Sequence, residues 1–319
     1  MRSVFTQPNP AEAILTMSIF KGLATLILAA VALSAVEAEP HCPGNVKSLS
    51  LRLVMRSQIV VPIAINHTGP YDFLVDTGAQ VTTVDPALAA ELHLKIQGTA
   101  GVTGVNVHAS APLTRLESVS TGAHSVDNVL AVVQNLGQTQ LADRRVRGVL
   151  AGNFLERFDL LIDYSHEILC LDDSMQMRAR VKGQHIALSA QPLSKQGSAA
   201  PQKLVVAVHL SGIAKRQLLQ LDSGSNVPLL YAGQDLGRLQ TVSAPLRGRG
   251  TDGQQHAFTV LAGQDVQVGP HSLRQVPFVT PMDAGRTPPK ADVDGLLPTV
   301  LFERVFVAYS DHYVVLEPW

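Results

Sequence analysis

One short pattern occurs twice in this chain, and its spacing constrains the fold more than any other feature of the sequence. An apolar run ends in Asp76-Thr77-Gly78, and a second apolar run ends in Asp222-Ser223-Gly224, 146 positions later. Gly148 and Gly295 repeat at nearly the same spacing, 147 positions. Self-similarity over such a span indicates a duplicated structural unit. We therefore expect two similar halves, each of which contributes one aspartate.

Each aspartate is predicted to lie where a strand ends in a tight turn. Residues 71–76 have the pattern of a strand that stops at Asp76, and β-branched residues resume after the turn. In the second half, residues 217–221 form the corresponding strand, which runs into Asp222. Glycine suits such turns because it tolerates φ > 0 and lets another backbone come close. The two carboxylates are therefore candidates for one shared site.

The composition is that of a folded, β-rich protein. Hydrophobic residues make up 46% of the chain and charged residues 16%, which excludes a disordered chain. Its 19 prolines and 24 glycines, among many short Val/Ile/Leu runs, favour strands over helical bundles. The formal net charge is −1 and no long basic run occurs, so neither nucleic acid nor an anionic membrane is an expected partner.

Residues 1–38 have the organisation of a signal peptide. Lys21 precedes the apolar stretch 22–33, and Val36-Glu37-Ala38 fits a cleavage site after Ala38. We expect an exported protein, periplasmic or secreted; an uncleaved anchor is the alternative. The apolar run is short for a membrane span, so no stable span is expected after cleavage.

The two cysteines allow two interpretations. In an oxidising compartment Cys42 and Cys170 could form a disulfide. Alternatively, Cys170 is a buried strand residue and Cys42 is a free thiol in a mobile terminal segment. The sequence alone leaves both interpretations open, because pairing depends on a distance.

The mature chain is predicted to consist of a first lobe at 46–175, a linker at 176–202 and a second lobe at 203–319. The linker assignment depends on the Gln/Ser/Gly/Pro-rich stretch 191–201. Residues 86–94 are expected to form a short helix with a proline near its start. Helical turns are expected near Glu156 and Glu303, which occupy matching places in the two halves.

The paired turns resemble the Asp-Thr-Gly-Ala signature of retropepsin-like aspartic proteases. Over nearly all of the mature chain, the sequence is similar to bacterial exported aspartyl proteases with two such domains in tandem, and more distantly to two-lobed pepsins. The resemblance implies an all-β fold with two similar acid-protease-type β-barrel lobes, related by a pseudo-two-fold axis. It also implies an aspartic-type endopeptidase that acts on a peptide or protein substrate.

The same resemblance implies roles for the residues of the two turns. Asp76 and Asp222 would be the catalytic pair, and the hydroxyl groups of Thr77 and Ser223 would form hydrogen bonds across the axis. The glycines that follow, Gly78 and Gly224, would let backbone amides approach the carboxylates.

A pair of carboxylates can hydrolyse an amide without a cofactor. Two carboxylates a few ångströms apart cannot both ionise cheaply, so they share a proton and their pKa values separate. The ionised member can activate water as a general base, and the protonated member can donate to the carbonyl oxygen. No cofactor is expected. No metal site is expected either, because the 11 histidines show no metal-ligand spacing.

Two glycine-rich stretches are flap candidates, that is, hairpins that would cover a bound peptide and pair with it as an added strand. The first is residues 98–104, with Gly101 and Gly104, and the second is residues 247–253, with Gly250 and Gly253. Plain surface turns would have much the same sequence.

Two departures from the family pattern leave other functions open. Ala151 and Pro298 stand where the family usually has glycine beneath the aspartate turn, and neither flap candidate contains the tyrosine of pepsin-like lobes. One alternative is therefore a catalytically weak or inactive peptide-binding protein with the same fold. Another is a homodimer in which each lobe pairs with its equivalent, although a monomer is the simpler expectation because one chain supplies both halves.

Overall fold

The computed structural model describes residues 41–104, 107–189, 201–231, 239–242, 245–249, 255–282 and 293–319. The predicted signal peptide at 1–38 lies outside these residues. The fold is nearly all β, as predicted. The strands of the first half are β1 (Ser48–Ser50), β2 (Arg52–Val54), β3 (Gln58–Ile65), β4 (Thr68–Val75), β5 (Thr82–Val84), β6 (Ile96–Gly104), β7 (Val107–Thr121), β8 (His124–Val133), β9 (Val146–Leu150), β10 (Asp159–Asp163) and β11 (Ile168–Asp172).

The remaining strands are β12 (Ile186–Ala187), β13 (Val205–Leu210), β14 (Ile213–Asp222), β15 (Leu229–Leu230), β16 (Leu246–Arg249), β17 (Gln255–Val260), β18 (Gln264–Val268), β19 (His271–Val276), β20 (Val279–Pro281), β21 (Gly295–Pro298), β22 (Phe302–Ala308) and β23 (Tyr313–Pro318). The helices are α1 (Pro86–Glu91), α2 (Gln138–Ala142), α3 (Gly152–Leu155) and the 3-10 helix η2 (Thr299–Leu301). No helix among the described residues is long and apolar enough to cross a membrane.

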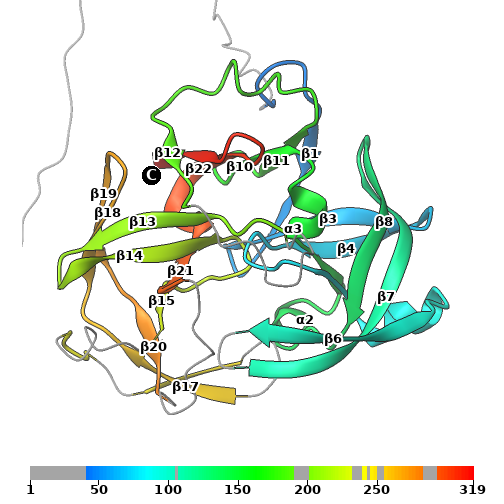
Figure 1. Ribbon diagram of the computed structural model, residues 1–319, viewed down its shortest axis with the longest axis horizontal. Helices are drawn as coiled ribbons and strands as arrows, with labels where there is room; N and C mark the ends of the chain where they lie inside the picture. Colours follow the sequence, from blue (N-terminus) through cyan, green and yellow to red (C-terminus); the bar gives the residue numbers. More distant parts are fainter. Residues whose placement is uncertain are drawn as a thin grey trace, which may run out of the picture. The chain divides into compact units, whose positions relative to one another are not determined.

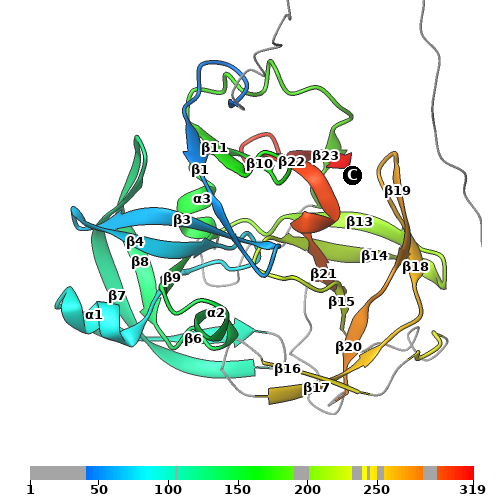
Figure 2. The same cartoon turned by 180° about the vertical axis from the view of Figure 1, so that it is seen from behind.

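The two halves form two sheets with the same central connections. The first sheet has the order β2-β3-β4-β9-β5-β8-β7-β6, and the second has the order β16-β17-β20-β15-β21-β14-β13-β18-β19. In the first, β4 runs parallel to β9, which is antiparallel to β5; in the second, β14 runs parallel to β21, which is antiparallel to β15. Figures 1 and 2 show these sheets on either side of the centre of the described structure. The duplicated sequence pattern therefore corresponds to a duplicated topology.

The first sheet also closes on itself. Besides its neighbours in the sheet order, β3 pairs with β7, so that the strands from β3 through β4, β9, β5 and β8 to β7 form a ring. Among the described strands of the second half, no corresponding pairing closes the sheet. A barrel form for both lobes therefore stays a prediction.

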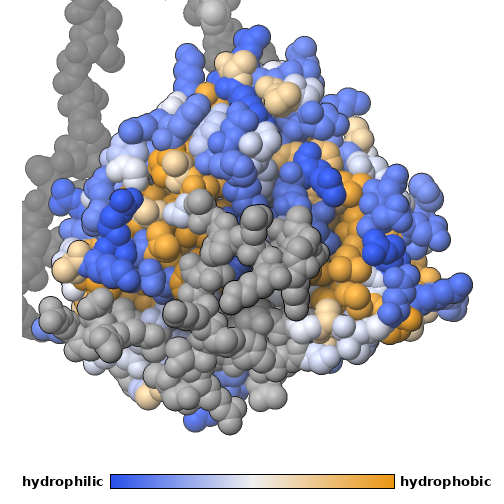
Figure 3. Space-filling model, viewed as in Figure 1, coloured by the Kyte–Doolittle hydropathy of each residue, from blue (hydrophilic) through white to orange (hydrophobic). Residues whose placement is uncertain are grey.

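A third sheet combines strands from both halves in the order β1-β11-β10-β22-β23-β12. Its central contact is the antiparallel pairing of β10 with β22, in which Leu161 lies opposite Phe306. The stretch 176–202, predicted as a linker, contributes β12, which pairs with β23. In Figure 1 this sheet lies above the two larger ones. The upper region in Figure 3 is mostly hydrophilic with some apolar residues, and larger apolar areas lie on either side below it. The halves are therefore joined by a sheet as well as by the chain.

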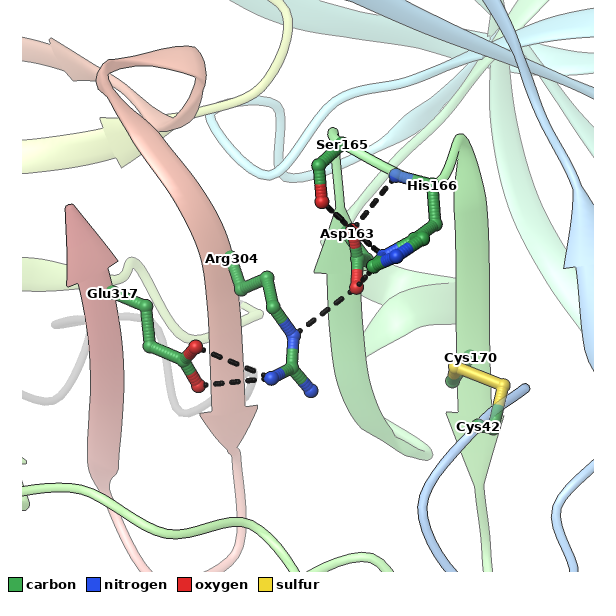
Figure 4. Close-up of polar contacts among 7 residues, drawn as sticks. All are labelled: Cys42, Asp163, Ser165, His166, Cys170, Arg304 and Glu317. Atoms are coloured by element: carbon green, nitrogen blue, oxygen red, sulfur yellow. Dashed lines mark hydrogen bonds and ion pairs between the residues drawn. A yellow bond between two sulfur atoms is a disulfide. The ribbon is translucent and has the colours of Figure 1, made fainter. Parts of the chain in front are cut away.

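Cys42 and Cys170 form a disulfide bond, which Figure 4 shows beside β11. This resolves the two interpretations that the sequence left open in favour of pairing. Both cysteines are completely buried, in a small apolar cluster with Leu161 and Phe306 of the shared sheet. The bond therefore ties the start of the described chain to that sheet.

Two helix predictions need correction. The helix at residue 86 ends at Glu91 rather than Leu94, because His93 adopts a left-handed backbone conformation with φ of 52°. Glu303 was expected in a helical turn but lies in β22, where its carbonyl oxygen accepts the N–H of Tyr164. The turn itself is present as η2 just before it, since β22 must start at Phe302 to pair with β23.

Candidate active site

Both aspartates lie where a buried strand ends. Val75, the last residue of β4, is completely buried, and Asp76 follows it directly; Asp222 is the last residue of β14. Each strand is held by a parallel neighbour, with Val75 opposite Leu150 and Asp222 opposite Pro298. Because both faces of these strands are packed, the position of each aspartate is set by the core beneath it.

The Asp76 carboxylate is bound by its own turn. Its Oδ1 accepts the backbone N–H groups of Gly78 at 2.8 Å and Ala79 at 2.9 Å. The backbone N–H of Asp76 itself donates to the carbonyl oxygen of Leu150 at 3.0 Å. A carboxylate that accepts amide hydrogen bonds is stabilised in its ionised form, and it is fixed in orientation.

The Asp222 carboxylate has the same arrangement in the second half. Its Oδ1 accepts the N–H groups of Gly224 at 2.8 Å and Ser225 at 3.1 Å. The two turns thus bind their carboxylates through equivalent atoms, as the sequence repeat predicted. The structure brings both turns together within one chain.

The hydroxyl groups of Thr77 and Ser223 connect the two turns. Ser223 Oγ donates to the carbonyl oxygen of Val75 at 2.7 Å and accepts the N–H of Thr77 at 3.1 Å. Thr77 Oγ1 donates to the carbonyl oxygen of Leu221 at 3.0 Å and accepts the N–H of Ser223 at 3.0 Å. Both residues are buried, so each hydroxyl uses its donor and an acceptor position within the protein.

The glycines of the two turns have no room for a side chain. A Cβ on Gly78 would lie 2.5 Å from Cγ of Asp222, and a Cβ on Gly224 would lie 2.5 Å from Cγ of Asp76. Each carboxyl group therefore packs directly against the turn of the opposite lobe. The two carboxyl groups are therefore close enough for the charge of Asp76 to raise the pKa of Asp222.

The pKa values of the two aspartates are both raised, but to different degrees. Burial raises the pKa of Asp76, while the amides of Ala79 and Gly78 lower it again in part. Burial and then the negative charge of Asp76 raise the pKa of Asp222 well above its usual range. Two carboxyl groups this close share a proton and titrate as a pair.

The departure at Ala151 is accommodated by the next residue. Ala151 is completely buried, and after it the N–H groups of Gly152 and Asn153 donate to the carbonyl oxygens of Ala79 and Gln80, at 2.9 and 3.1 Å. A Cβ on Gly152 would lie 3.3 Å from the Ala79 oxygen. The glycine one position later thus permits close packing beneath the first turn.

Two glutamines of the site were not identified from the sequence. Gln58 Nε2 donates to the carbonyl oxygen of Gly224 at 2.7 Å, and Gln220 Nε2 donates to the carbonyl oxygen of Gly78 at 2.9 Å. Gln220 could have been noticed as an amide within an otherwise apolar strand end. Gln58 carried no such signal, because its partner lies 166 positions away.

The first flap candidate, residues 98–104, lies on one strand of an antiparallel pair. Gly101 and Gly104 lie on β6, which pairs antiparallel with β7, with Gly104 opposite Val107. Gly250 and Gly253 lie outside the described residues; the strands on either side of them, β16 and β17, also form an antiparallel pair. Among the residues that the structure describes, no group of His, Cys, Asp and Glu could hold a metal ion.

Comparisons with known proteins found similarity in the first half of the chain. Residues 61–154, which run from within β3 through the Asp76 turn into α3, match the sequence profile of a family described as "Aspartyl protease". A search of curated proteins found no match. Among solved structures, a retropepsin-like aspartic protease from Rickettsia conorii matches with 23% sequence identity and a TM-score of 0.29, over 39% of this chain and 87% of that chain. The profile match shows that residues 61–154 are similar to aspartyl proteases.

Proposed function

We propose that this protein is an aspartic-type endopeptidase that hydrolyses peptide bonds of peptides or proteins with Asp76 and Asp222. The observation that carries the proposal is that each carboxyl group packs against the glycine of the opposite turn, 2.5 Å from the place that a Cβ would take. Both carboxyl groups also have raised pKa values. Turn-forming aspartates with only structural roles would not need to be brought together in this way.

The proposed reaction uses the two carboxyl groups in different protonation states. The ionised Asp76 takes a proton from a water molecule as the water oxygen attacks the carbonyl carbon, and Asp222 gives its proton to the carbonyl oxygen. The tetrahedral intermediate then collapses: the C–N bond breaks, the nitrogen receives a proton from Asp76, and Asp222 recovers its own. The products are a carboxylic acid and an amine, and the pair returns to its starting state.

The surrounding structure supports this assignment of roles. The amide pair at each Oδ1 and the Thr77–Ser223 network hold the carboxyl groups without movement of the core. The hairpin of β6 and β7 offers strand edges with which an extended peptide could pair. We further propose that the protein acts as a monomer, because both turns come from one chain, and that it is exported, in keeping with its disulfide.

Replacement of each aspartate tests the proposal. In Asp76→Asn and Asp222→Asn we expect hydrolysis of a peptide library to fall by about a thousandfold or more, and pepstatin to inhibit the unchanged protein. The matched control is Asp127→Asn, which changes an exposed carboxylate on β8. Activity that survives in both single variants would contradict the mechanism. Peptide binding by calorimetry without turnover from acid to neutral pH would instead support a binding protein.

A further inference from the structure

The two glutamines near the pair cross between the lobes in opposite directions. Gln58, the first residue of β3, reaches from the first lobe to the catalytic turn of the second, where it binds the oxygen of Gly224 at 2.7 Å. Gln220, on β14, reaches from the second lobe to the turn of the first, where it binds the oxygen of Gly78 at 2.9 Å. The two contacts are thus reciprocal, although the glutamines do not occupy matching positions of the repeat.

Each bound carbonyl belongs to the peptide group that also holds an aspartate. The oxygen of Gly78 and the N–H of Ala79 are two ends of one peptide group, and that N–H donates to Asp76 Oδ1 at 2.9 Å. Hydrogen bonds in such a chain polarise one another, so a donor at the oxygen makes the N–H a stronger donor. The amide of Gln220 is therefore connected to the Asp76 carboxylate through one peptide group.

The second chain of hydrogen bonds has the same order. Gln58 donates to the oxygen of Gly224, and the N–H of the same peptide group, that of Ser225, donates to Asp222 Oδ1 at 3.1 Å. Each aspartate is therefore linked to a glutamine from the opposite lobe.

The fold does not require an amide at the position of Gln220, because the first half has a leucine at the matching position. The matching residue of the first half is Leu74, which also lies two positions before its aspartate and is 3% exposed. Gln220 is 5% exposed, and an amide buried at such a place costs free energy unless its donors find partners. The oxygen of Gly78 supplies a partner.

We propose that Gln58 and Gln220 are positioning residues that act on opposite aspartates, each by holding the peptide group whose N–H stabilises the other lobe's carboxylate. Their importance for hydrolysis rests on the proposed function; their effect on the carboxyl groups does not. Gln220 acts on Asp76 and Gln58 acts on Asp222.

The sign of the effect follows from which form the N–H groups stabilise. They donate to the ionised carboxylates, so weakening them raises the pKa of the aspartate concerned. Without the Gln220 amide, the ionisation of Asp76 moves to higher pH. Without the Gln58 amide, the ionisation of Asp222 moves to higher pH.

Two tyrosines are the other described groups that titrate beside the pair. Burial and then the charge of Asp222 raise the pKa of Tyr231 to about 12. The pKa of Tyr164 is raised further by burial, with a smaller contribution from Asp222. Both phenols stay neutral from acid to weakly alkaline pH, so they do not contribute to the two ionisations.

Methionine substitutions test the proposal, because methionine resembles glutamine in length but has no N–H donor. We would measure the carboxyl ¹³C shifts of both aspartates against pH in Gln220→Met and Gln58→Met, and the pH profile of kcat/KM. We expect the pKa read from the Asp76 carboxyl shift to rise by about half a pH unit in Gln220→Met, and the pKa read from the Asp222 shift to rise by a similar amount in Gln58→Met. The control is Gln217→Met, which removes a buried amide of the same strand that donates to the oxygen of Lys215.

Several results would overturn the proposal. Unchanged ionisations in both variants would do so, as would equal shifts of both ionisations in each variant or in the control. A lower KM with unchanged ionisations would mean that the glutamines merely compete with substrate for the two carbonyl oxygens. If Gln220→Met does not fold, as judged by thermal unfolding, Gln220→Leu takes its place, because Leu74 is accommodated at the matching position. If Gln58→Met does not fold, Gln58→Asn takes its place, because the asparagine side chain is one methylene shorter.

The NMR titration separates this inference from the proposed function. If no variant and no wild-type sample hydrolyses peptides but the carboxyl ionisations shift as described, the endopeptidase proposal fails and the positioning role stands. If the wild-type protein hydrolyses peptides but the carboxyl ionisations do not change in the variants, the positioning role fails and the endopeptidase proposal stands.

Discussion

Thr77 and Ser223 exchange hydrogen bonds through both their hydroxyl groups and their backbone amides. Each hydroxyl accepts the N–H of the other residue and donates to a carbonyl oxygen of the other lobe's strand. The contact is buried, so each of the two aspartate turns is fixed by the opposite lobe as well as by the core beneath it. The distance between the carboxyl groups depends on this exchange.

Removal of one hydroxyl should cost both stability and activity. In Ser223→Ala the N–H of Thr77 and the oxygen of Val75 lose their partners in a buried place, so we expect the free energy of unfolding to fall by about 2–4 kcal/mol. Urea denaturation measures this. The control Thr68→Ala removes an exposed hydroxyl on β4, and should change the free energy of unfolding by less than about 0.5 kcal/mol. Equal losses in both variants would contradict the cross-lobe role.

A side chain at the turn glycines should separate the two carboxyl groups. In Gly78→Ala the new Cβ would lie 2.5 Å from Cγ of Asp222, so one of the two must move. We expect peptide hydrolysis to fall by about a hundredfold or more. Gly101→Ala is the control for folding, since nothing lies within 4 Å of its Cβ, and it should unfold at the same temperature as the wild type. A fully active Gly78→Ala protein would contradict the described geometry.

The raised pKa of Asp222 should make the fold less stable as pH rises. The Asp222 carboxyl group binds its proton more tightly in the folded protein than in the unfolded chain. Its contribution to the free energy of unfolding is therefore fully present below the ordinary carboxyl pKa. The contribution is lost as pH rises from there through the folded pKa. Asp222→Asn removes the ionisation while its amide can still bind Asp76.

We therefore expect Asp222→Asn to gain stability relative to the wild type as pH increases from about 3 to 7, measured by urea denaturation at each pH. The difference between the two proteins isolates this group from the other carboxylates. Among those, Asp163 has a lowered pKa. Burial raises the pKa of Asp163, but the hydrogen bonds from His166 and Ser165 and the charge of His166 together outweigh burial. A constant difference across this range would contradict the raised pKa of Asp222.

Reduction of the disulfide should destabilise the shared sheet. Cys42 and Cys170 close a loop of 128 positions, for which chain entropy predicts a loss of about 4–5 kcal/mol when the bond is absent. Urea denaturation with and without reductant measures the loss. The double variant Cys42→Ser with Cys170→Ser should match the reduced protein and respond to no reductant. A wild-type protein whose stability ignores reductant would show that the bond is absent in solution.

The candidate site was largely predictable because its parts are local. Asp76, Thr77 and Gly78 form one turn, and the repeat supplied the second turn without any knowledge of the fold. The two glutamines were not predictable, since their partners lie 166 and 142 positions away. Neither was the third sheet: the apolar pattern of β10 and β22 indicates buried strands, but pattern alone does not tell which strands pair.

Another polar connection within that sheet also depends on pairing across the halves. Asp163 on β10 forms an ion pair with Arg304 on β22 at 3.1 Å, and Arg304 in turn binds Glu317 on β23 (Figure 4). On the first-half side, the ring of His166 and the hydroxyl of Ser165 also bind Asp163. The sequence alone does not identify these residues, because a charged side chain near the end of a strand is ordinarily solvated.

The pairing of β10 with β22 has a consequence for the order of events during folding. These strands are far apart in the chain, and contacts of such long sequence separation form slowly. Until they form, β10 has an unpaired edge, and the two halves lack the sheet that joins them. The two aspartates also come from different halves, so under the proposed function a chain whose halves have not yet joined would carry no active peptidase.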